Sequence, residues 1–61
     1  MTKKHFIAIA ASINDVREQS SDSPETVWAL DEVSNNIADV CADTNPNFDR
    51  ERFLEACGVE A

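Results

Sequence analysis

The apolar residues of this chain recur at intervals of three and four positions, in three segments separated by short polar stretches. That spacing places the apolar side chains of each segment along one side of an α-helix, whereas a half-buried strand would alternate at every second position. The polar stretches hold both prolines and several serines and asparagines, which are typical of turns. The pattern predicts an all-α fold with three helices.

The first predicted helix spans residues 3–19, with Thr2 as its N-cap. Residues 20–23 form the connection that follows. Because this connection is only four residues long, we expect the second helix to run back antiparallel to the first, as a helical hairpin. The apolar stripe of the first helix consists of Phe6, Ile9, Ala10, Ile13 and Val16.

The second predicted helix spans residues 24–43. Ser23 is its N-cap, and Pro24 occupies the first helical position, where the missing N–H costs nothing. Pro46 ends the helix, because proline disfavours helical geometry in the residue before it. The apolar stripe consists of Val27, Leu30, Val33, Ile37, Val40 and Cys41.

The third predicted helix is short, spanning residues 50–57, and covers the hairpin. Asp49 is its N-cap, and Phe48 and Phe53 have the spacing of a hydrophobic staple across that cap. Gly58 stands where a left-handed C-cap is expected. Residues 1–61 are therefore predicted to be a single small helical domain. Ile7 lies off the first stripe, and we expect Phe48, Phe53 or Leu54 to cover it.

Several classes of function are disfavoured by composition. A core of this size leaves no room for an internal substrate cavity, so we expect a protein that is not an enzyme and uses no cofactor. Gly58 is the only glycine, which excludes a glycine-rich phosphate loop. The formal net charge of −7 argues against direct binding to nucleic acid. No apolar run approaches the ~20 residues of a membrane span, and we see no signal-peptide cleavage site, so we expect an intracellular protein.

Metal binding is also disfavoured. His5, Cys41 and Cys57 have no recognised zinc-site spacing, and we interpret both cysteines as buried, unpaired packing residues. A disulfide between them would require the two helices to touch and an oxidising compartment. Residues 43–51 imitate the start of a calcium loop, but the glycine and glutamate that such a loop needs are replaced by Phe48 and Leu54. We predict no metal site.

The two ends of the chain resemble a known group of proteins. The segment NPNFDRERFLEACGV at residues 45–59, together with TKKHFIAIA at residues 2–10, is similar to the ends of small accessory proteins from phages and prophages of actinobacteria. Residues 17–40 carry no motif that matches. The resemblance implies a phage-encoded accessory protein of unknown biochemical role; it favours host-factor binding and brings no catalytic residues. We expect such a protein in the host cytoplasm.

The distribution of charge is the most unusual feature of the chain. No Lys or Arg occurs between Arg17 and Arg50, so the second helix has no compensating partners within its own turns. One interpretation is a solvated face that maintains solubility; another is an acidic surface directed at a basic partner. The carboxylates in this interval are Glu18, Asp22, Glu25, Asp31, Glu32, Asp39, Asp43 and Asp49.

Trp28 lies opposite the apolar stripe of the second helix, among polar residues. Either it folds against the connection at residues 20–23, or it contacts another chain, since tryptophan is enriched among binding hot spots. We predict a partner-binding surface formed by Trp28, Asp31, Glu32, Asn35 and Asp39.

Three functional hypotheses follow from these features. The first is a non-enzymatic phage accessory protein that uses this surface to bind a host or phage protein, or to form a homodimer. The second is an acidic inhibitor that imitates DNA towards a nucleic-acid-binding host or defence protein. The third, a metal-dependent activity at His5 and the cysteines, has the least support.

Overall fold

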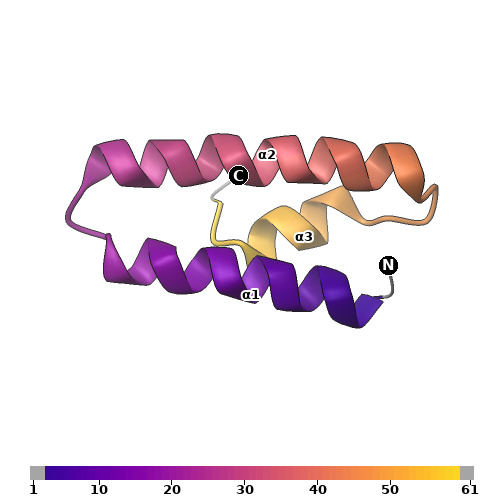
Figure 1. The fold of residues 1–61 in the computed structure, drawn as a ribbon, viewed down its shortest axis with the longest axis horizontal. Coiled ribbons are helices and arrows are strands. Elements are labelled where there is room, and N and C mark those ends of the chain that lie inside the picture. Colours follow the sequence, from indigo (N-terminus) through magenta and orange to yellow (C-terminus); the bar gives the residue numbers. More distant parts are fainter. Residues whose placement is uncertain (1–2, 60–61) are drawn as a thin grey trace.

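The computed structural model describes residues 3–59 and contains three helices, α1 (Lys3–Gln19), α2 (Pro24–Thr44) and α3 (Arg50–Ala56). The prediction of a small all-α fold is confirmed, and the helix boundaries agree with the predicted ones to within one residue. Figure 1 shows α1 and α2 as an antiparallel hairpin, with α3 lying between them near the end where α1 begins. Every pair of helices is in contact. The predicted cap at Thr2 lies outside the described residues.

The start of α2 is set by backbone conformation. Ser23 has an extended backbone at the N-cap position and Pro24 occupies the first turn, as predicted. The Ser23 hydroxyl, however, pairs with the Thr26 hydroxyl at 3.0 Å and accepts no backbone N–H. The N-cap position is therefore confirmed, whereas the expected side-chain cap is absent.

The predicted start of α3 is confirmed in detail. The Asp49 carboxylate accepts a hydrogen bond from the backbone N–H of Arg52 at 3.1 Å. The Phe48 and Phe53 rings pack across this cap with centroids 5.4 Å apart, which is the hydrophobic staple. Phe48 also contacts Phe6 of α1 edge to face, with centroids 5.0 Å apart. The staple thus fixes α3 against α1.

Gly58 ends α3 with a φ of +89°, in the left-handed region. Its N–H donates to the carbonyl of Glu55, and the N–H of Val59 donates to the carbonyl of Leu54, each at 3.0 Å. These two bonds form a Schellman motif. A Cβ atom at position 58 would lie 2.5 Å from Asn14 Oδ1 and 2.7 Å from Arg17 Cδ, so these side chains would have to shift, in addition to the strain of a positive φ at any residue other than glycine.

The core is built mainly from small residues. Phe53, at 4% exposure, is the only bulky side chain that is buried among the described residues. Partly buried side chains from all three helices pack around this centre, including Ile9, Ile13, Ile37 and Leu54. The other buried residues are Ala10, Ser34, Ala38, Cys41 and Cys57.

Three members of the predicted stripes are exposed. Val16, Val33 and Val40 have 45%, 46% and 62% of their surface accessible, so the prediction that they belong to the core is wrong. The reason is that α2 packs against both α1 and α3, and contact with α3 moves its buried side towards Ser34 and Ala38. Val33 and Val40 lie on the opposite edge of that side.

Ile7 is 56% exposed, so the expectation that an aromatic residue or Leu54 covers it is also wrong. It lies at the edge of an open groove between α1 and α3, which has a volume of about 750 Å³. We call this the α1–α3 groove. Its apolar lining consists of Phe6, Ile7, Ala10, Phe48, Phe53 and Ala56.

Candidate protein-interaction surface

Trp28 lies in the N-terminal half of α2 and is 67% exposed. It is therefore not folded against the connection at residues 20–23. A tryptophan side chain exposes a large apolar area when it is left in water, and burying that area against a partner is favourable. The exposure of Trp28 satisfies the first requirement for a contact residue.

The other predicted contact residues divide into two groups. Glu32 is exposed, as Trp28 is. Asp31 instead forms an ion pair with Arg17 of α1, with Nη1 and Oδ1 2.6 Å apart. Asn35 and Asp39 both contact Arg50 of α3, at 3.2 Å and 2.5 Å. Three of the five residues are thus engaged within the chain, and only Trp28 and Glu32 are fully available to a partner.

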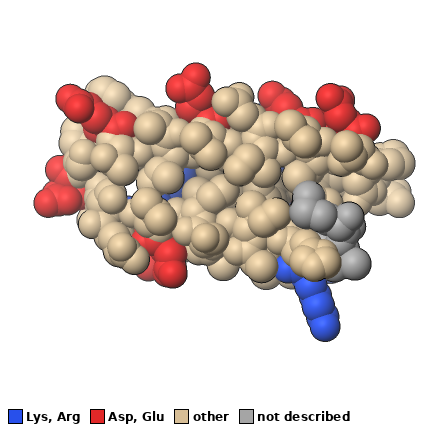
Figure 2. All heavy atoms as spheres, viewed as in Figure 1, with Lys and Arg blue, Asp and Glu red and all other residues tan. Residues whose placement is uncertain are grey.

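The negative charge of α2 is partly compensated by arginines from the other two helices. The sequence shows no basic residue within α2, but Arg17 and Arg50 reach it from the two helices on either side. Acidic side chains nevertheless follow the outer edge of α2 in Figure 2. Glu25, Glu32 and Asp43 are exposed on this helix. The acidic surface predicted from the sequence is therefore present but smaller than the list of carboxylates suggests.

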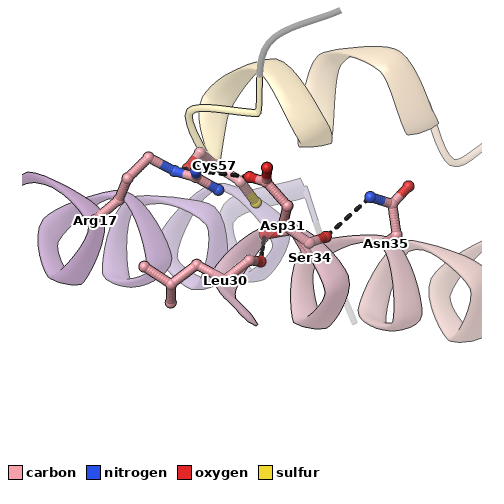
Figure 3. Close-up of polar contacts among 6 residues, drawn as sticks. All are labelled: Arg17, Leu30, Asp31, Ser34, Asn35 and Cys57. Atoms are coloured by element: carbon pink, nitrogen blue, oxygen red, sulfur yellow. Dashed lines mark hydrogen bonds and ion pairs between the residues drawn. The ribbon is translucent and has the colours of Figure 1, made fainter. Parts of the chain in front are cut away.

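Arg17 joins all three helical segments, a role that sequence reasoning missed. Its Nε donates to the carbonyl oxygen of Cys57 at 2.9 Å, while its Nη1 faces Asp31 (Figure 3). Its Nη2 is buried and has no hydrogen-bond partner among the described residues. The available signal was position: Arg17 follows Ile13 by four residues and so continues the buried stripe of α1.

Two further polar side chains, Ser34 and Asn35, form hydrogen bonds along α2. Ser34 is fully buried and donates its hydroxyl proton to the carbonyl of Leu30 at 2.7 Å, and the Asn35 amide donates to the carbonyl of Asp31 at 2.9 Å (Figure 3). Both bonds run back along α2 to the residue four positions earlier. They satisfy polar groups within the helix, so we interpret this cluster as structural.

The cysteines are both free and buried, which confirms their interpretation as packing residues. Burial raises the pKa of the Cys57 thiol, although hydrogen bonding to Ser34 and the charge of Arg17 act in the opposite direction. A raised pKa reduces the thiolate that nucleophilic chemistry requires. No three His, Cys, Asp or Glu residues between positions 3 and 59 are grouped so that they could hold a metal ion.

No helix within residues 3–59 has both the length and the apolar character required to cross a bilayer. No family model, curated protein or solved structure matches the chain. The resemblance to phage accessory proteins therefore stays a prediction that depends on the residues at the two ends of the sequence.

Proposed function

We propose that this chain is a small non-enzymatic phage accessory protein that binds a host or phage protein through Trp28 and the acidic face of α2. The exposure of Trp28 is the observation that carries the proposal. Glu25 and Glu32 lie one helical turn before and after it, and both are exposed. A large apolar side chain flanked by carboxylates suits a partner with an apolar pocket and a basic rim.

The cellular setting proposed is the host cytoplasm. This part of the proposal depends on the resemblance of residues 2–10 and 45–59 to actinobacterial phage proteins. The chemistry of the described residues supports a binding role over catalysis, because the cysteines are buried and the α1–α3 groove is open to solvent.

The test is affinity capture from an actinobacterial lysate at low and high salt, with wild type and Trp28→Ala compared directly. Val40→Ala is the matched control, because Val40 is 62% exposed on α2 but lies about a third of a turn away from Trp28. We expect capture of a specific partner by wild type and by Val40→Ala, and loss of that partner with Trp28→Ala. Capture that is equal for all three proteins would contradict the proposal.

The second candidate function is that of an acidic inhibitor that imitates DNA. The row of acidic side chains along α2 in Figure 2 favours it. A 21-residue helix is about 31 Å long, enough to imitate a short stretch of phosphates. This mechanism predicts binding that weakens steeply with salt and is insensitive to Trp28→Ala, whereas an apolar contact at Trp28 tolerates salt.

A further inference from the structure

We infer that the α1–α3 groove receives Trp28 from a second copy of this chain, and that the two copies insert Trp28 into each other reciprocally. This inference deepens the proposed function, because it depends on Trp28 as a contact residue and names one partner. The two halves of the contact, an exposed tryptophan and an aromatic groove, are both present on a single chain.

The amount of exposed surface is the first reason to expect a partner. A compact chain of 6.7 kDa has an accessible surface of about 3,900 Å², whereas this one has 4485 Å². The excess is roughly 600 Å², and the elongated shape of the hairpin, 35 × 17 × 16 Å, contributes to it. Ile7 and Trp28, which are 56% and 67% exposed, are among the bulky apolar side chains that add to this surface.

The groove is chemically suited to an indole ring. Phe6, Phe48 and Phe53 supply aromatic edges and faces, and Ile7 at the rim is 56% exposed. Aromatic pairs of this kind gain attraction beyond the area that they bury. The groove is open to solvent, so an inserted side chain would not have to displace any part of the fold.

The charges around the two features are complementary. Lys3 and Arg52 line the groove and are exposed, together with the carboxylate of Asp49, so these three side chains give the lining one net positive charge. The side chains one turn from Trp28 are the carboxylates of Glu25 and Glu32. Insertion of Trp28 therefore brings opposite charges together at the rim. A partner with only a basic surface would match the carboxylates but would leave the aromatic groove empty.

Trp28 lies on the face of α2 that α3 contacts, and α3 also forms one wall of the groove. Trp28 shares one face of α2 with Asn35 and Asp39, since the three positions are separated by seven and four residues. Arg50 of α3 contacts that face at Asn35 and Asp39. The face that carries Trp28 is thus the face that Arg50 of α3 contacts further along, and residues of α3 also line the groove, together with residues of α1.

The position of Trp28 along the helix also suits a two-fold arrangement. Ser34 is the midpoint of α2, and Trp28 precedes it by six residues, or about 9 Å. A two-fold axis through the midpoint places Trp28 of one copy level with position 40 of the other. Since Arg17 pairs with Asp31 in an antiparallel hairpin, position 40 lies level with Ala8 of α1, next to the groove residue Ile7.

The third helix leaves room for this arrangement. The seven residues of α3 are about 10 Å long, whereas α2 is about 31 Å long, so α3 occupies only one part of the hairpin (Figure 1). Arg17, Val27, Asp31 and Gly58 line a shallow depression beside it. In the reciprocal dimer, α3 of each copy would lie over the part of the hairpin that the other copy's α3 does not occupy.

The experiment is sedimentation equilibrium of wild type, Trp28→Ala, Ile7→Asp and the control Val40→Ala, at low and high salt. We expect wild type and Val40→Ala to dimerise, and each of the other variants to weaken the dimer at least ten-fold. High salt should change the wild-type dimer little, because it screens both the attraction at the rim and the repulsion between two copies of charge −7. Circular dichroism checks that each variant keeps its helices.

A mixture of Trp28→Ala with Ile7→Asp gives the decisive result. The first variant keeps an intact groove and the second keeps Trp28, so a heterodimer regains one of the two contacts that each variant alone has lost. We expect association in the mixture at concentrations where neither variant self-associates. A monomeric wild type, an unaffected Trp28→Ala dimer, or no association in the mixture would each overturn the reciprocal dimer.

The two proposals fail separately. A monomeric wild type that still captures a lysate protein through Trp28 would remove the dimer and leave the proposed function in place. A Trp28-dependent dimer that captures no other protein would remove binding to a separate host or phage protein and leave the dimer in place.

Discussion

At the scale of single residues, Cys57 shows how a small protein holds an ionisable group. The thiol is fully buried, beside Ser34 and within reach of the charge on Arg17. Burial is the largest influence on its pKa and favours the neutral form. In the folded state Cys57 therefore stays protonated at pH values where the unfolded chain is deprotonated.

This difference predicts a pH-dependent stability. The unfolded thiol titrates near its ordinary pKa of 9.0, and the folded thiol has a higher pKa. Since the unfolded state then binds fewer protons, the free energy of unfolding should decrease as the pH rises above about 9. Urea denaturation between pH 7 and 10, under reducing conditions, measures this decrease.

Two variants test the assignment to Cys57. Cys57→Ala should remove this part of the decrease, whereas Cys41→Ala keeps Cys57 and should retain it. An identical pH dependence in Cys57→Ala and wild type would show that another group is responsible.

At the scale of helices, the two N-caps of α2 and α3 differ in how they act. Asp49 accepts a hydrogen bond from Arg52, whereas the Ser23 hydroxyl pairs with Thr26 and leaves the first backbone N–H groups of α2 uncapped by its side chain. Pro24 already removes one of the N–H groups that would need a partner. The two sites therefore allow an N-cap whose side chain accepts a backbone N–H to be compared with one whose side chain does not.

We predict that Asp49→Ala lowers the free energy of unfolding by about 1 kcal/mol. Ser23→Ala should cost less, because only a bond between two hydroxyl groups is lost. Thermal and urea denaturation of both variants gives the comparison. Equal losses would mean that the Asp49 carboxylate contributes nothing beyond its backbone position.

The same scale shows what sequence reasoning can predict here. Helix boundaries, the Asp49 cap, the staple and the left-handed Gly58 depend on residues within a few positions of one another, and all were predicted. The buried side of α2 was not predicted correctly at Val33 and Val40. It depends on the direction from which α3 approaches, and no local pattern in α2 contains that direction.

The candidate surface was predictable in part for the same reason. The exposed position of Trp28 follows from helical periodicity within α2 alone. The contacts of Asp31 with Arg17, and of Asp39 with Arg50, join side chains on different helices. Periodicity identifies which residues share a face but does not identify which cation reaches them.

At the scale of the whole molecule, Arg17 and Arg50 each connect helices through polar contacts. The Arg17 side chain is 13% exposed and reaches both Asp31 and the turn after α3, whereas Arg50 is 39% exposed and its partner Asp39 is 66% exposed. Water weakens the second pair much more than the first.

We predict that Arg17→Met lowers the free energy of unfolding by about 2–3 kcal/mol, because it leaves Asp31 and the Cys57 carbonyl without their partner. Arg50→Met should cost less than about 1 kcal/mol. Urea denaturation at a protein concentration low enough to keep the chain monomeric separates the two effects from any self-association. A larger loss for Arg50→Met would show that the exposed pair matters more than its setting suggests.

The small side chains at the centre of this fold have a consequence for how the chain can vary. Ala10, Ser34, Ala38 and Cys57 let three helix backbones approach closely, so an added methyl group there has no free volume to enter. Bulky side chains such as Val16, Val33 and Val40 lie outside and can shrink without opening a cavity. At these four small positions the size limit is therefore an upper one, whereas truncation of the buried Phe53 would open a cavity.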